Sequence, residues 1–237
     1  MLLSLELYQV VIAGDVLSSL VSSCPLLERL TFTSSNSFDY LEIVAPKLKY
    51  FSCEGLFRSI CVRMPHIADV TVVMKGSRNQ LGFNEGERSN SVMLLRSIPM
   101  VEFLVLDYPY VKCLAARGVR ERLPTTLNNL QDLLLHDICF GEPDEVSIVL
   151  YSIRCSPNLQ GISIRAFHGA TAAVDPVVEL FDLQGWSKFS LKKLFFVLME
   201  EVSGTDAEME FIKLLLAKSP TLQSMRIKLK SMEVVKN

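Results

Sequence analysis

The sequence predicts an α/β solenoid, in which repeated units of helix, turn and strand stack into one curved parallel sheet with helices on its convex side. Two observations predict this fold. Six prolines are followed by the same apolar spacing, and several of them are preceded by amphipathic, helix-like stretches. Apolar residues make up 49% of the 237 residues. This composition excludes a mainly disordered chain and is sufficient for a large buried core.

The repeated unit is defined by the apolar residues that follow each proline. Pro25 is followed by Leu27, Leu30 and Phe32, which lie two, five and seven positions later. The same three positions are apolar after every proline of the set, which is Pro25, Pro46, Pro65, Pro99, Pro157 and Pro220. Because about half of the chain is apolar, such regularity is not expected by chance.

Three further segments carry this spacing without a proline in register. Their apolar positions are Leu5 and Leu7; Leu127, Leu130, Leu133 and Leu135; and Leu191, Leu194 and Phe196. The sequence therefore predicts nine strands, separated by 19 to 34 residues. This pattern is an irregular L-x-x-L-x-L repeat of the leucine-rich class.

Elementary backbone chemistry explains the residue types in the unit. The final pair of alternating apolar residues points to one face of a short strand. Proline restricts its own backbone and disfavours helix in the residue before it, so we expect a helix to end at each proline. Asp15 is a candidate helix N-cap, and Thr205 and Glu208 have the spacing of a capping box before a second helix. A third helix is expected within residues 142–156.

Two long intervals interrupt the repeat. Residues 75–91 are polar and contain Gly and Asn, which predicts an exposed loop. In the second interval we expect a short helix near Val174 to Leu183, followed by a loop with Trp186. Trp186 is a candidate binding anchor, but partial burial against the repeat core is the favoured explanation of this tryptophan.

Several segments resemble a known family. "VLSSLVSSCPLLERLTF", "IVAPKLKYFSCEG" and "VRERLPTTLNNLQDLLL" are similar to the leucine-rich region of plant F-box proteins. The C-terminal stretch "SLKKLFFVLMEEVSGTDAEMEFIKLLLAKSPTLQSMRIKL" resembles the FBD module of that family, most closely over residues 208–227. The resemblance implies a leucine-rich-repeat region over residues 1–188 and an FBD-like module over residues 189–237 that continues the solenoid.

The resemblance also implies a function. Proteins of this family act as substrate receptors in cullin-based (SCF) ubiquitin ligases and dock on a Skp adaptor through an N-terminal F-box. We therefore expect a protein substrate as partner. The Skp adaptor and cullin are expected only if an F-box lies upstream of this chain. The alternative is a leucine-rich-repeat interaction scaffold without a ubiquitin-ligase role.

Signatures of catalysis are scarce in the sequence. It contains no GxSxG, GxxxxGK[ST], GxGxxG or HExxH motif. The histidines His66, His136 and His168 are far apart, and ordinary turn positions account for them. The carboxylates Glu200, Glu201, Asp206, Glu208 and Glu210 match no calcium loop, and interaction with a helix dipole explains them better. We expect no enzyme activity, cofactor or metal.

Charge and cysteine content restrict the classes of partner and the cellular location that we expect. The net charge of −2 favours neither nucleic acid nor an anionic membrane, and no apolar run is long enough to span a bilayer. Arg226, Lys228 and Lys230 could contact nucleic acid, although cations also protect the exposed edge of a terminal strand. The six cysteines form no CxxC pair, so we expect free thiols and a location in the cytoplasm or nucleus.

The candidate binding surface consists of side chains between the inward apolar residues of each strand. These residues, expected on the concave side, are Thr31, Ser52, Thr71, Val105, Leu134, Ser163, Phe195 and Arg226, with Arg29 beside them. The middle of the series is apolar. An exposed apolar patch there would favour protein binding, whereas neighbouring loops or helices could instead cover it.

Overall fold

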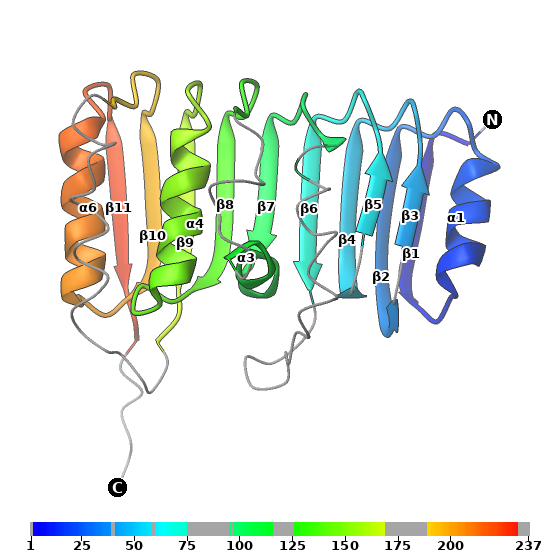
Figure 1. Cartoon of the computed structure of the whole chain (residues 1–237), viewed down its shortest axis with the longest axis horizontal. Helices are drawn as coiled ribbons and strands as arrows, with labels where there is room; N and C mark the ends of the chain where they lie inside the picture. The colour runs from blue at the N-terminus through cyan, green and yellow to red at the C-terminus, as the bar shows by residue number, and fades with distance from the viewer. Residues whose placement is uncertain are drawn as a thin grey trace, which may run out of the picture.

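The chain forms one large parallel sheet with helices against one side (Figure 1). The computed structural model describes residues 2–38, 41–57, 60–74, 95, 97–115, 126–168 and 189–231. The sheet has nine strands in the order β1-β2-β4-β6-β7-β8-β9-β10-β11, and all neighbours are parallel. The strands follow one another in sequence order, as in a solenoid. The predicted α/β repeat fold is thereby confirmed.

The strands of the large sheet are short, from 5 residues in β7 to 10 in β2. They are β1 (Ser4–Val10), β2 (Arg29–Phe38), β4 (Tyr50–Phe57), β6 (Asp69–Met74), β7 (Phe103–Asp107), β8 (Asp132–Ile138), β9 (Gly161–Ala166), β10 (Phe196–Val202) and β11 (Ser224–Leu229). The described helices are α1 (Gly14–Ser22), α3 (Tyr108–Ala115), α4 (Pro143–Arg154) and α6 (Asp206–Lys218).

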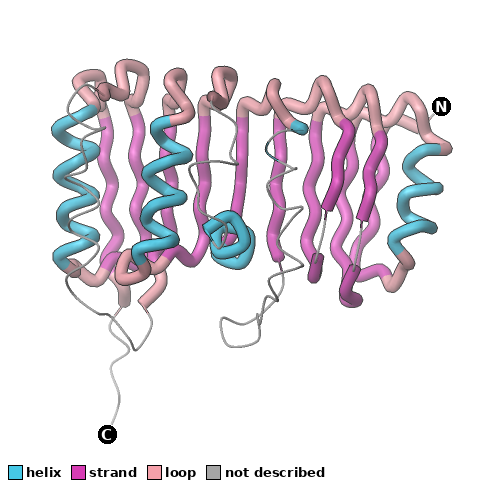
Figure 2. Tube along the Cα trace, in the orientation of Figure 1, coloured by secondary structure: helices cyan, strands magenta, loops and turns pink. Residues whose placement is uncertain are grey.

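All four helices lie on the same side of the sheet (Figures 1 and 2). The apolar pair of each central strand points to this side and is buried; Leu30 and Phe32 of β2, for example, are both fully buried. Helix residues such as Leu17, Val149 and Phe211 belong to the same continuous core. The core is therefore a layer between the sheet and its helices, and it runs along the whole array.

Two repeats differ from the prediction of a helix before every proline. The segments before Pro46 and Pro65 are strands, β3 (Leu41–Val44) and β5 (Ile60–Arg63), which form a separate two-stranded parallel sheet. They lie on the helix side of the large sheet (Figure 2). These repeats are the shortest of the chain, and their segments are rich in β-branched residues. A four-residue extended segment crosses the layer where the chain is too short for a helix.

A tight turn precedes every strand from β2 to β11 in the large sheet. In the repeat of Pro25, the N–H of Leu27 donates to the carbonyl of Cys24 at 3.0 Å. The equivalent bond occurs before each of the other strands, at 3.1 to 3.3 Å. Proline has the backbone conformation required at the second position of such a turn. Asn128 and Lys192 occupy that position in the two repeats without proline.

Each strand is joined to the preceding one by a shared carbonyl at its start. The carbonyl of Leu3 accepts the N–H groups of Glu28 and Arg29 at 2.9 and 3.0 Å. The same pair of hydrogen bonds to one carbonyl oxygen recurs before every later strand of the sheet. Turn and shared carbonyl together fix the register of each repeat on its neighbour.

The register of β10 differs from the prediction by three residues. Leu194 occupies the turn position equivalent to Leu27, and the inward pair is Val197 and Met199, which align with Ile162 and Ile164 of β9. Phe195 therefore precedes the strand and does not lie between two inward residues. The segment is apolar throughout, so two registers satisfy the L-x-x-L-x-L pattern and the sequence alone does not separate them.

Three strands end in the same bulge. Gln9, Asp137 and Glu201 each follow the second inward residue of their strand by two positions and have φ of 52°, 60° and 58°. The pairing register shifts at these places in β1, β8 and β10. A residue in the left-handed conformation is characteristic of one common class of bulge.

Two expectations lie outside the described residues. They are the exposed loop over residues 75–91 and the helix near Val174 to Leu183 with the loop of Trp186. The boundary between residues 188 and 189 stays a prediction, although β10 pairs with β9 in one continuous sheet.

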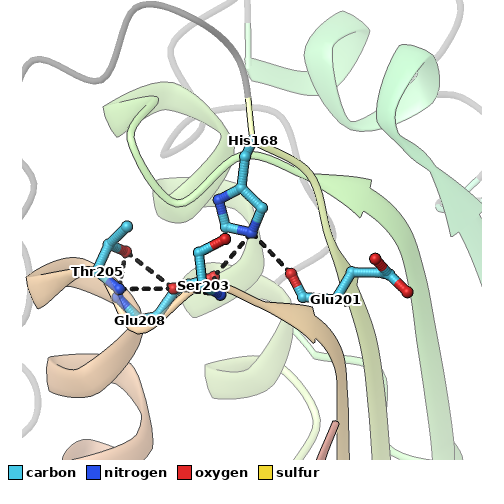
Figure 3. A network of polar contacts seen from close by, with 5 residues as sticks. All are labelled: His168, Glu201, Ser203, Thr205 and Glu208. Carbon is cyan, nitrogen blue, oxygen red and sulfur yellow. Dashed lines mark hydrogen bonds and ion pairs between the residues drawn. The ribbon is translucent and has the colours of Figure 1, made fainter. Parts of the chain in front are cut away.

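A buried glutamate organises the start of α6 (Figure 3). Thr205 and Glu208 form the predicted capping box, in which the Thr205 N–H donates to Oε2 of Glu208 at 2.8 Å. The same oxygen accepts the N–H of Ser203 at 3.2 Å, and Oε1 lies 3.4 Å from Nε2 of His168. That ring nitrogen also donates to the Glu201 carbonyl at 2.7 Å. Glu208 thus joins the ends of β9 and β10 to the helix.

A comparable glutamate stands at the start of α4. Glu145 is fully buried and accepts the N–H of Cys139 at 2.9 Å. Both glutamates occupy the third position of their helix. In each case the carboxylate satisfies a backbone N–H of the loop that leaves the preceding strand.

We expect Glu208→Ala to lower the free energy of unfolding by about 2 kcal/mol, because it removes a helix cap and leaves loop N–H groups without their acceptor. Urea denaturation measures the change. The control is Glu210→Ala on the same helix, which removes only the exposed ion pair with Lys213 and should cost less than about 0.5 kcal/mol. Equal effects of the two variants would contradict the structural role of Glu208.

The β10 register predicts opposite tolerances at two adjacent residues. Val197→Asp places a carboxylate in the core, where Val197 is fully buried, and should cost more than about 3 kcal/mol. Leu198→Asp changes a partly exposed residue on the other face and should cost far less. Thermal melts of the two variants compare them directly. The opposite order would support the register with Leu194 and Phe196 inward.

Candidate protein-interaction surface

The face of the large sheet opposite the helices is the candidate functional site. No described helix lies on it (Figure 1). Side chains alternate along each strand, so those between the inward residues project from this face. In β8 and β10 the alternation is visible as buried and partly exposed residues in turn. We call this surface the open face.

Parallel register aligns the open-face residues of neighbouring strands into rows. The middle row contains Glu6, Thr31, Ser52, Thr71, Val105, Leu134, Ser163, Leu198 and Arg226, each paired with the next. Seven of the eight residues predicted for this row therefore lie in it. Leu198 takes the place predicted for Phe195.

The predicted apolar patch is only partly exposed. Val105 is 5% exposed, so it is covered and contributes little to the surface. Leu134 and Leu198 remain partly exposed on either side of Ser163. Phe195 is 42% exposed, but it lies at the start of β10 beside the open face. The surface apolar residues of the middle row are thus Leu134 and Leu198.

A first row lies closer to the turns. It contains Ser4, Arg29, Tyr50, Asp69, Phe103, Asp132, Gly161, Phe196 and Ser224. The guanidinium of Arg29 lies 4.2 Å from the centre of the Tyr50 ring, and that of Arg226 lies 5.8 Å from the centre of Phe196. Both are cation–π contacts. Arg29 was the one residue of this row predicted to face a partner, and Phe196 was predicted to point inward. Each residue of the row directly precedes the inward pair of its strand.

The first row contains a depression of about 350 Å³. It is lined by Tyr50, Asp69, Glu102, Phe103, Gln131 and Asp132, which come from four consecutive strands and the residues just before two of them. Burial raises the pKa of the Asp132 carboxyl. The lining carries carboxylates and aromatic rings but no cationic side chain.

The third row lies two positions after the middle row, toward the bulges, and carries paired charges. It contains His136 with the adjacent Asp137, Arg165, Glu200 and Lys228. Nε of Arg165 lies 2.9 Å from a carboxylate oxygen of Asp137, and Nζ of Lys228 lies 2.7 Å from one of Glu200. The hydrogen bond from Lys228 lowers the pKa of Glu200. Burial and the nearby Arg165 lower the pKa of His136, which favours the neutral imidazole. These charges offset one another within the protein.

Of the histidines and carboxylates singled out in the sequence, the structure brings His168 next to Glu208, with Nε2 3.4 Å from Oε1, in the network that holds the start of α6. His66 is exposed in a turn, His136 lies in the third row, and His168 donates to a backbone carbonyl. Of the acidic cluster, Glu200 and Glu210 form ion pairs and Glu208 binds backbone N–H groups. Within the described ranges, no group of three or more His, Cys, Asp or Glu residues could hold a metal ion.

The described cysteines Cys24, Cys53, Cys139 and Cys155 are free thiols. Burial raises the pKa of Cys53 well above its ordinary value, so this thiol is held in its unreactive protonated form. None of the helices in the described part of the chain has the length and apolar character needed to cross a bilayer.

Comparison with known proteins agrees with this architecture. Residues 1–164 match the model of the LRR repeats of FBD-associated F-box protein At5g56370. The chain is 33% identical over 230 residues to F-box/FBD/LRR-repeat protein At1g13570 of Arabidopsis thaliana, covering 94% of this chain and 54% of that protein. It thus spans about half of the relative's length. No solved structure matches the chain significantly.

The family model covers more than half of the sequence, and the nine-stranded array agrees with a leucine-rich solenoid. The chain belongs to the F-box/FBD/LRR-repeat protein family.

Proposed function

We propose that this chain is the substrate-recognition portion of an F-box-type SCF ubiquitin ligase and that it binds a protein substrate on the open face. The observation that carries the proposal is the asymmetry of the sheet, in which helices cover one face and no described helix covers the other (Figure 2). Solenoids commonly use such an extended sheet surface to bind partners.

The composition of the open face supports a protein partner. Its middle row combines the apolar Leu134 and Leu198 with small hydroxyl residues, and the neighbouring rows add aromatic rings and charges. Protein interfaces are typically built from such a mixture of apolar centre and polar surroundings. Family membership supports the same role, because the names of the matched proteins include the F-box.

The ligase role requires contact with the Skp adaptor and cullin. In this proposal the contact is made by an F-box upstream of the repeats. The name of the Arabidopsis relative includes an F-box. Co-purification of the complete gene product with a Skp adaptor tests it. We expect stoichiometric adaptor with the complete protein and none with residues 1–237 alone.

A complete product that lacks an F-box, or that does not retain the adaptor, would exclude the ligase role. The chain would then act as a leucine-rich-repeat interaction scaffold. Quantitative mass spectrometry of the co-purified proteins distinguishes the two outcomes, because the scaffold retains other partners while adaptor and cullin are absent.

If the substrate binds on the open face, a substitution there should weaken substrate binding, and a similar substitution on the helix side should not. Leu134→Arg should weaken substrate retention by the complete protein at least tenfold, about 1.4 kcal/mol, since it places a long cation at the centre of the surface. Leu216→Arg is the matched control: Leu216 is 55% exposed on α6, on the helix side. Loss of substrate with Leu216→Arg and retention with Leu134→Arg would place the interface on the helices.

A further inference from the structure

The depression in the first row has a specific arrangement of charge and aromatic surface. Phe103 lies between Asp69 of β6 and Asp132 of β8, its direct partners in the parallel register. Adjacent strands are about 4.8 Å apart, so the two aspartates stand on the strands at either side of Phe103. Glu102 adds a third carboxylate beside Phe103, and Tyr50 a second ring. We call this site the aromatic–acidic groove.

In the part of the chain that the structure describes, no cation pairs with the carboxylates of the groove. Within the described part of the chain, Asp69, Glu102 and Asp132 form no ion pair. The closest cation of the row, Arg29, lies over Tyr50. By contrast, carboxylates of the third row such as Asp137 and Glu200 have cationic partners. The negative charge of the groove is therefore available to a ligand.

The aromatic rings of the first row show which ligand fits. Tyr50 and Phe196 each carry an arginine of the protein over the ring. Phe103, between two carboxylates, has no such contact with a described cation. A guanidinium or ammonium group placed over Phe103 would gain a cation–π contact and two ionic hydrogen bonds at once.

We propose that the aromatic–acidic groove binds an arginine or lysine side chain of the partner protein. The proposal rests on the proposed function, because it assigns a chemical class to the partner of the open face. The groove volume of about 350 Å³ accommodates the end of one long side chain. A bare metal ion does not fit, since the acidic residues do not form a metal-binding group within the described chain. An anion would be repelled by the three carboxylates.

The ionised carboxylate of Asp132 lowers the stability of the isolated protein. Burial raises its pKa, which means that the ionised form is less favourable in the folded state than in the unfolded chain. At neutral pH this lowers the stability of the fold, and the penalty disappears as the pH falls below the unfolded pKa. Gly161, which has no side chain, leaves space for the carboxylate on β9. A bound cation would offset the penalty.

The direct probe is Nα-acetyl-arginine methylamide, titrated into the isotope-labelled complete chain and followed by NMR. The neutral isostere Nα-acetyl-citrulline methylamide is the ligand control. We expect the arginine probe to shift the amide signals of Phe103 and Asp132 at millimolar concentration and the citrulline probe to have little effect. Equal shifts with both probes, or no shifts in the groove, would overturn the proposal.

Paired variants test the role of charge. Asp69→Asn with Asp132→Asn removes two groove carboxylates without changing their shape and should weaken binding of the arginine probe at least tenfold. Asp15→Asn with Asp144→Asn removes the same charge from exposed helix positions and should leave it unchanged. Equal weakening by both pairs would show a general charge effect and overturn the site.

A second measurement separates binding from folding. Asp132→Asn should raise the thermal midpoint at pH 7, because the partly buried carboxylate is replaced by a neutral group, while it weakens binding of the arginine probe. A residue that only supports the fold would lower both. If the complete protein retains its substrate fully after Asp69→Asn and Asp132→Asn, the groove proposal fails and the proposed function stands. If the arginine probe binds but no Skp adaptor co-purifies with the complete protein, the groove proposal stands and the ligase role fails.

Discussion

The structure depends on a short backbone device that is repeated at the start of each strand from β2 onward. A turn closes two residues before the strand, and one carbonyl of the preceding repeat then accepts two N–H groups. These hydrogen bonds satisfy backbone groups that would otherwise lack a partner. They join each repeat only to its neighbours. Because the device recurs with constant spacing, every strand enters the sheet in the same register.

Constant register has a direct consequence for the open face. Residues at the same position of successive repeats become neighbours about 4.8 Å apart, although they are 19 or more residues apart in the chain. Cross-strand contacts then decide the character of each row. In the third row, opposite charges meet and pair. In the first row, Asp69, Phe103 and Asp132 meet without a cation, which produces the aromatic–acidic groove.

The connections on the helix side must satisfy the backbone groups of the loops and cover the core. Where β8 and β10 end in a bulge, the chain leaves the sheet through a loop whose backbone N–H groups need acceptors. Glu145 and Glu208 provide acceptors for such groups from inside the core. In the shorter repeats a brief strand replaces the helix, so the layer over the core is kept although its secondary structure changes.

The sequence by itself determined the class of fold. The proline and apolar spacing depend on local backbone preferences and on side-chain alternation, which act within one repeat and can be recognised without its neighbours. The nine strands, the inward positions of Leu30 and Phe32, and the capping box of Thr205 and Glu208 follow from these local rules. Most of the middle row was predicted for the same reason.

The tertiary structure decided what local rules leave open. Two registers of β10 bury apolar pairs equally well, and only the turn at Leu194 and the pairing with β9 select Val197 and Met199. The burial of Val105 and the β3–β5 sheet depend on contacts between repeats. The aromatic–acidic groove combines side chains of four repeats, so no single segment contains its signal. Its charge pattern exists only once parallel pairing has placed Asp69 and Asp132 on either side of Phe103.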